Sequence, residues 1–208
     1  MNTYILGNGG FAQELFESFF IPHNQYNFSG FIILNGDKAF VISEQGIHPF
    51  TNDKDAAFVI GTQNPIWRLK FIKHFTQLYE INKKHFPNIQ SKAHISRTAI
   101  IGVGNVFAPF SSINGIAQIG NFNSFSTYSS ANNRSKIGNN NIFGSYAGIM
   151  NKCCIGDNNV FQPNSIVTEH ISVGNDNLVS AGECVFDNIN NEELFQSGII
   201  LKKPNKGV

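Results

Sequence analysis

A glycine-rich run near the start of the sequence holds the first residues whose type and spacing could do chemistry. Gly7-Asn8-Gly9-Gly10-Phe11-Ala12 fits the pattern GxGxxA and stands between the short apolar run Tyr4–Leu6 and a predicted helix. Backbone N–H groups of such a loop can bind the phosphates of a nucleotide, although the same glycines also suit a purely structural turn. An NAD site is disfavoured, because it requires an acid about twenty positions after the glycines, and Asp37 is the nearest one to the end of the predicted second strand. The candidate residues for contact with a nucleotide or a nucleotide-linked sugar are Gly7, Asn8, Gly9, Gly10, Phe11, Asp37 and Gly61.

The cysteines and histidines predict neither a metal site nor a disulfide framework. The three cysteines, Cys153, Cys154 and Cys184, include no CxxC pair, and the six histidines have no ligand spacing. We therefore expect no metal and expect reduced thiols in a cytoplasmic protein. A net charge of +1 argues against nucleic-acid binding, and there is no apolar run of membrane-spanning length and no signal peptide.

A six-residue period dominates the second half of the sequence. Every sixth residue from Ile89 to Val185 is apolar, and this repeat matches neither the period of an α-helix nor that of a coiled coil. An eighteen-residue period lies on top of it, with glycines at Gly102, Gly120, Gly138, Gly156 and Gly174 and asparagines at Asn105, Asn123, Asn141, Asn159 and Asn177. Three hexapeptides therefore make one coil, and the pattern predicts a triangular parallel β-helix with glycine and asparagine at its corners.

The first half of the sequence has a different pattern. Apolar runs predict strands at Tyr4–Leu6, Phe28–Leu34 and Ala57–Gly61, and helices are predicted over Gln13–Phe20 and from Pro65, which Asn64 would cap. We expect Ile66, Leu69, Ile72, Phe75 and Leu78 to form the buried stripe of the second helix. The strand–helix–strand order predicts a small, parallel, Rossmann-like sheet over residues 1–88, a β-helix over 89–189 and a tail at 190–208 that packs on the β-helix.

This combination resembles the NeuD/PglD-type sugar acetyltransferases. Leu6-Gly7-Asn8-Gly9-Gly10-Phe11-Ala12 looks like the start of that family, and Ile89-Gln90-Ser91-Lys92-Ala93-His94-Ile95-Ser96 looks like the start of its β-helix. The resemblance implies a left-handed β-helix and a homotrimer. It also implies acetyl-CoA between neighbouring prisms and a nucleotide-linked sugar on the N-terminal domain, in surface-polysaccharide or glycan biosynthesis.

The residues that the family uses for catalysis are only partly present. Aligned on Ile137-Gly138, the family's basic histidine falls on Asn133 and its acidic neighbour on Arg134. Asparagine does not accept a proton near neutral pH, so this position is at most a substrate contact, as is Tyr146. His170, two coils further along the same column, is the alternative base. For coenzyme A the resemblance implies Gly144, Ala181, Gly182 and Lys202.

Three functions are compatible with these residues. An amine is already partly neutral at pH 7, so N-acetyl transfer tolerates the missing base better than O-acetyl transfer does. The first hypothesis is therefore an acetyl-CoA-dependent N-acetyltransferase for a nucleotide-linked amino sugar. The others are a catalytically silent trimeric scaffold and an O-acetyltransferase that uses another base such as His170.

Overall fold

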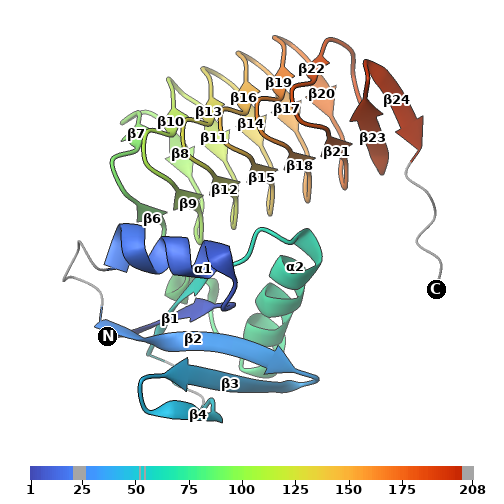
Figure 1. Ribbon diagram of the computed structural model, residues 1–208. Helices are drawn as coiled ribbons and strands as arrows, with labels where there is room; N and C mark the ends of the chain where they lie inside the picture. Colours follow the sequence, from blue (N-terminus) through green and yellow to red (C-terminus); the bar gives the residue numbers. More distant parts are fainter. Residues whose placement is uncertain (21–26, 52, 54, 203–208) are drawn as a thin grey trace. The chain divides into compact units, whose positions relative to one another are not determined.

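The chain folds into two compact units, Met1–Ile89 and Gln90–Val208. The computed structural model describes residues 1–20, 27–51, 53 and 55–202 (Figure 1). The end of the predicted C-terminal tail, residues 203–208, lies outside the described residues. No helix among the described residues is long and apolar enough to cross a membrane.

The N-terminal unit contains a five-stranded mixed sheet in the order β4-β3-β2-β1-β5. Its strands are β1 Asn2–Leu6, β2 Asn27–Asn35, β3 Lys38–Ser43, β4 Gly46–Pro49 and β5 Ala57–Ile60. β1 pairs in parallel with β2 and β5, whereas β2, β3 and β4 are joined by antiparallel pairing. The three predicted strands are therefore present and pair in parallel, but the sheet as a whole is mixed, because β3 and β4, which were not predicted, extend it by antiparallel pairing. β2 and β3 form a hairpin that was not predicted. Its signal in the sequence is the two-residue turn Gly36–Asp37, in which Gly36 has φ 59°.

Two helices follow the parallel strands. α1 covers Gly10–Leu15 and continues as the π-helical turn Phe16–Phe20, and α2 covers Pro65–Lys73 and continues as the π-helical turn His74–Leu78. A short 3₁₀ turn at Lys83–His85 precedes the second unit. The predicted cap of α2 is confirmed, since Asn64 Oδ1 accepts the N–H groups of Ile66 and Trp67, both at 3.1 Å.

The predicted apolar stripe of α2 is confirmed at Phe75, which is fully buried, but was wrong at its two ends. Ile66 and Leu78 are 59% and 58% exposed, whereas the buried side chains of α2 and its π-helical continuation are Arg68, Phe71, His74 and Phe75. The buried face is therefore shifted from the predicted one, with Phe75 common to both.

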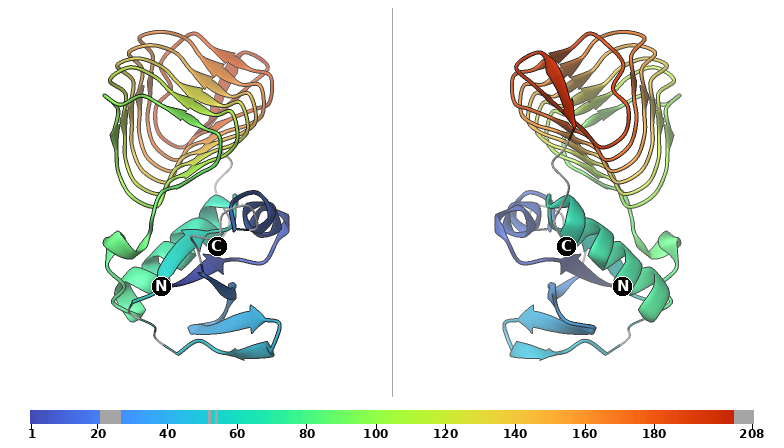
Figure 2. Two further views of the ribbon diagram at one scale, coloured as in Figure 1. Left: turned by 90° about the vertical axis from the view of Figure 1, so that its left-hand side faces the viewer. Right: turned by 90° about the vertical axis from the view of Figure 1, so that its right-hand side faces the viewer.

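The second unit is a left-handed parallel β-solenoid of about six coils. Figure 2 shows the coils stacked as triangles. The first side carries β6 Ile89–Gln90, β9 Val106–Phe107, β12 Ser124–Phe125, β15 Ile142–Phe143, β18 Val160–Phe161 and β21 Leu178–Val179. The second carries β7 His94–Ile95, β10 Ser112–Ile113, β13 Ser130–Ala131, β16 Gly148–Ile149, β19 Ile166–Val167 and β22 Cys184–Val185. The third carries β8 Ile100–Ile101, β11 Gln118–Ile119, β14 Lys136–Ile137, β17 Cys154–Ile155 and β20 Ser172–Val173. The hairpin β23 Glu193–Gln196 and β24 Ile199–Lys202 extends the first side.

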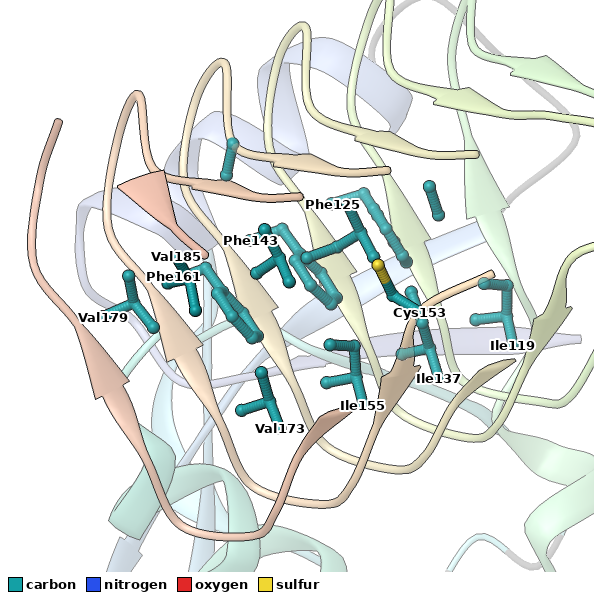
Figure 3. Packing of buried hydrophobic residues seen from close by; sticks show 14 of the residues in the cluster. Ile119, Phe125, Ile137, Phe143, Cys153, Ile155, Phe161, Val173, Val179 and Val185 are labelled. Atoms are coloured by element: carbon teal, nitrogen blue, oxygen red, sulfur yellow. The ribbon is translucent and has the colours of Figure 1, made fainter. Parts of the chain in front are cut away.

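Most of the solenoid core comes from the residues of the six-residue series, and Ala117, Ala147, Cys153, Ile189 and Phe195 complete it. Phe107, Phe125, Phe143 and Phe161 are at most 1% exposed and form one stack, with ring centroids 5.4, 4.4 and 5.1 Å apart (Figure 3). Isoleucine and valine from the other two sides fill the rest of the interior. Because each coil repeats the same inward positions, the sequence period translates directly into a continuous apolar column.

Candidate functional site

A cleft of about 350 Å³ lies in the N-terminal unit, where β1, β2 and β5 end. Parallel strands bring their carboxyl ends to one edge of a sheet, so the loops that follow them line the same hollow. The lining residues are Gly7, Asn8, Gly9, Gly10, Phe11, Ile33, Leu34, Gly61, Thr62, Gln63, Trp67 and Phe71. None of these described lining residues is acidic, so hydrogen bonding to a ligand there depends on the backbone and on neutral side chains.

The glycines of the cleft have two different functions. Gly7 has φ +115°, and a Cβ there would lie 3.1 Å from Gly61 O, so the turn after β1 requires glycine. At Gly61 a Cβ would lie 3.0 Å from Ala12 Cβ, which explains the glycine at the end of β5. A Cβ at Gly9 or Gly10 would meet nothing within 4 Å, so these two leave the start of α1 open to close approach by a ligand.

Asp37 is not part of the cleft. It lies in the exposed turn between β2 and β3, and the residues at the end of β2 that line the cleft are Ile33 and Leu34. The other six candidates, Gly7, Asn8, Gly9, Gly10, Phe11 and Gly61, are brought together there. The sequence did not predict the wall of the cleft that the β5–α2 loop and α2 form. This wall includes Thr62, Gln63, Trp67 and Phe71.

Arg68 supports that wall from inside the fold. Its side chain is fully buried, and Nη1 donates a hydrogen bond of 2.8 Å to Thr62 O in the loop between β5 and α2. Burial lowers the pKa of the guanidinium to about 10, which still leaves it charged at neutral pH. A buried charge of this kind holds the loop backbone to α2 through a charge-assisted hydrogen bond.

His74 is the other buried ionisable group of α2 and its continuation. It is 9% exposed and its Nε2 has no hydrogen-bond partner among the described residues. Burial lowers the pKa of its imidazole, Asp37 opposes this effect, and Lys70 reinforces it. His74 does not line the cleft.

In the solenoid, Asn133 and Arg134 lie at the corner between the second and third sides. Arg134 and His170 both have positive φ, 60° and 67°, and all three residues are exposed. Asn133 Oδ1 accepts the N–H of Ile116 at 3.2 Å and Asn133 O accepts the N–H of Lys152 at 3.0 Å, so Asn133 also links three coils. His170 lies two coils along the same column, about 10 Å away at one strand spacing per coil.

The coenzyme A candidates lie elsewhere in the chain. Ala181 and Gly182 occupy the corner between the first and second sides, where Tyr146 stands two coils earlier. Gly144 directly follows β15 at the start of the same corner, and a Cβ there would lie 2.7 Å from Pro163 N. Lys202 ends β24 and is exposed. Within one chain the solenoid therefore does not bring these residues to the corner that carries Asn133, Arg134 and His170.

The corner between the first and second sides, which carries Ala181 and Gly182, also contains an exposed aromatic ladder. Phe110, Tyr128 and Tyr146 are 53%, 48% and 57% exposed, and their rings stack with centroids 5.1 and 4.9 Å apart. A broad groove of about 890 Å³ follows the third side of the solenoid and includes Lys136, Cys154 and Ser172 in neighbouring coils. The three cysteines are free, and burial raises the pKa of the Cys153 thiol. The part of the chain that the structure describes contains no cluster of three or more His, Cys, Asp or Glu residues suited to a metal ion.

Residues 134–169 match the family described as bacterial transferase hexapeptide (six repeats). No curated protein sequence matches the chain. Three solved structures are similar over nearly the whole chain. WeeI from Acinetobacter baumannii AYE is 18% identical with a TM-score of 0.78, and the alignment covers 97% of this chain and 100% of that chain.

The second structure is perosamine N-acetyltransferase from Caulobacter crescentus, a histidine-to-asparagine mutant in complex with CoA and GDP-perosamine. It is 16% identical with a TM-score of 0.77, and the alignment covers 99% of this chain and 98% of that chain. The acetyltransferase domain of PglB from Neisseria gonorrhoeae FA1090 is 14% identical with a TM-score of 0.74, covering 96% and 99%. These comparisons confirm, at the level of the fold, the resemblance to sugar acetyltransferases.

Proposed function

We propose that the protein is an acetyl-CoA-dependent acetyltransferase that N-acetylates a nucleotide-linked amino sugar in glycan biosynthesis. The observation that carries the proposal is the order of the two units, a glycine-lined cleft followed by a six-coil solenoid. This order is shared over 99% of the chain with an N-acetyltransferase that was solved with CoA and GDP-perosamine. We also propose that the protein is cytoplasmic and a homotrimer.

The N-terminal unit is proposed to be Rossmann-like and to bind the nucleotide part of the substrate. In support, Gly9 and Gly10 line the cleft at the start of α1, and neither carries a side chain that would block a diphosphate. Anions are favoured at such a position because the first N–H groups of a helix have no partner within the helix.

The solenoid is proposed to bind acetyl-CoA between two copies of the chain. One corner of the solenoid carries small residues that leave room for a ligand, namely Gly144, Ala181 and Gly182. The next corner of the same chain carries Asn133 and Arg134. A trimer would bring the two sets of residues together, because one corner of a prism would then face a different corner of the neighbouring chain. Lys202 would add a positive charge for the phosphates of coenzyme A.

The chemistry proposed at this interface needs little from a protein base. The neutral amine nitrogen attacks the thioester carbonyl, the new C–N bond forms, the C–S bond breaks, and the thiol of coenzyme A leaves with the proton that the nitrogen loses. An amine with a pKa of about 8 is roughly one tenth neutral at pH 7. Asn133 would orient the substrate and Arg134 would meet a phosphate or carboxylate, while a sugar hydroxyl would remain unreactive because it needs deprotonation.

Two alternatives remain testable. A silent trimeric scaffold would bind ligands without turnover, and an O-acetyltransferase would depend on His170. His170 is a weaker candidate within one chain, because it is exposed and lies two coils, about 10 Å, from Arg134 along the same corner.

The experiment combines calorimetry with acetyl-CoA, mass spectrometry of acetyl transfer to UDP- and GDP-linked amino sugars, and light scattering. We expect acetyl-CoA binding, an acetylated amine and a particle of about 69 kDa from chains of 23.0 kDa. The rate should increase about tenfold per pH unit below pH 8, as the amine deprotonates. Binding without transfer would support the scaffold, and loss of transfer in His170→Ala with a hydroxyl sugar as acceptor would support the O-acetyltransferase. A monomer would contradict the interface site.

A further inference from the structure

Trp67 is the most exposed of the three aromatic side chains that line the cleft, since Phe11 is half-buried and Phe71 is buried. It is the single tryptophan of the sequence and is 43% exposed, whereas its neighbour Phe71 is 4% exposed and belongs to the packed core. Both line the cleft, and their ring centroids are 6.3 Å apart. Phe71 therefore supports the wall, and Trp67 presents a flat apolar surface beside it.

The position of Trp67 is fixed from several directions. The backbone N–H of Trp67 donates to Asn64 Oδ1 at 3.1 Å, which holds this residue in the first turn of α2. The Nζ of Lys70 lies 4.7 Å from the centroid of its ring, a cation–π contact that orients the indole and places a positive charge at the wall. The adjacent Arg68 holds the start of α2 to Thr62 in the loop before it. An aromatic side chain that is held in place in this way loses little conformational entropy when it binds a ligand.

The remainder of the cleft is lined by glycine backbone and neutral side chains. The loop Gly7–Phe11 lies in the same hollow, and Gly9 and Gly10 leave its backbone unobstructed. A flat π-surface together with a glycine-rich helix start fits a ligand that has an aromatic ring and phosphates. We propose that the base of the nucleotide stacks on Trp67 while its diphosphate lies at Gly9 and Gly10. This inference rests on the proposed function, in which the N-terminal unit binds a nucleotide-linked sugar.

Stacking on an indole is tolerant of base identity, because every base has a π-face. The lining residues offer no carboxylate to distinguish guanine from uracil. UDP and GDP are therefore the probes, and inorganic pyrophosphate is the probe without a base. The matched control is Ile66, which precedes Trp67 on α2, is 59% exposed and does not line the cleft.

The test is calorimetry of the full chain with the three probes, together with the fluorescence of Trp67. We expect UDP and GDP to quench the fluorescence of the wild type. Trp67→Ala should raise both dissociation constants by about 5-fold to 150-fold, the range for loss of one stacked base, and leave pyrophosphate binding unchanged. Trp67→Phe should change them by less than about 3-fold, because a flat ring remains, and Ile66→Ala should have no effect.

Two results would overturn the stacking while leaving the proposed function intact. One is unchanged UDP and GDP binding in Trp67→Ala, and the other is an equal loss for pyrophosphate, which would indicate damage to the cleft instead of a lost base contact. If neither nucleotide binds the wild type, the stacking is wrong. Acetyl transfer to a nucleotide-linked amino sugar, measured separately, then decides whether the proposed function also fails.

Discussion

The buried asparagine ladder of the solenoid predicts that an alanine substitution lowers the free energy of unfolding more in the middle of the ladder than at its last rung. Asn141 is fully buried, and its side chain makes four hydrogen bonds. Nδ2 donates to Asn123 Oδ1 at 3.1 Å and to Gly156 O at 2.9 Å. Oδ1 accepts from the backbone N–H and from the Nδ2 of Asn159, at 2.8 and 3.0 Å.

The substitution Asn141→Ala removes a hydrogen-bond partner from three polar groups, two of them buried and one part-buried. These are the carbonyl of Gly156 and the two donors of Asn159. A buried donor or acceptor left without a partner costs about 1–3 kcal/mol, so the free energy of unfolding should fall by about 3 kcal/mol or more.

Asn177, the last of the buried rungs, is the matched control. Its Nδ2 has no hydrogen-bond partner among the described residues, and its Oδ1 accepts the N–H of Glu193 at 2.7 Å. Asn177→Ala therefore leaves one part-buried donor unpaired and should cost about 1 kcal/mol. Urea unfolding followed by circular dichroism measures both variants. Equal losses, or a larger loss for Asn177→Ala, would refute the view that the ladder bonds determine the effect.

Two further predictions concern stability. Because burial lowers the pKa of the His74 imidazole below its value in the unfolded chain, protonation favours unfolding as the pH falls below about 6.5. Scanning fluorimetry from pH 7.5 to 5.5 should therefore show a smaller loss of melting temperature for His74→Gln than for the wild type; identical slopes would contradict this. A Cβ at Gly120 would lie 2.5 Å from the backbone oxygen of Gly138, so Gly120→Ala should cost about 1–3 kcal/mol in urea unfolding. Gly9→Ala, whose Cβ meets nothing within 4 Å, should change stability by less than about 0.5 kcal/mol, and a comparable loss in both would refute the steric argument.

The six-residue period made the buried positions of the solenoid predictable from the sequence. The buried positions of the N-terminal unit were less predictable. In the solenoid each inward position repeats a local pattern, so Phe143 is buried between the equivalent residues of the coils on either side. In the N-terminal unit the burial of α2 depends on a sheet whose strands come from distant parts of the sequence. The apolar spacing selected Ile66 and Leu78, yet the fold buries Arg68.

The sequence by itself determined the two-unit order, the coil length, the apolar column and the glycine-rich turn after β1, because these depend on residues close together or on an exact repeat. Only the tertiary structure decided which residues form the cleft. It excluded Asp37, which lies in the two-residue turn after β2 and does not line the cleft, and it added Trp67, whose position depends on how α2 packs on the sheet. It also determined that Asn133 serves as an acceptor between neighbouring coils, since its partner Ile116 is seventeen residues away in the chain and adjacent only after the solenoid has closed.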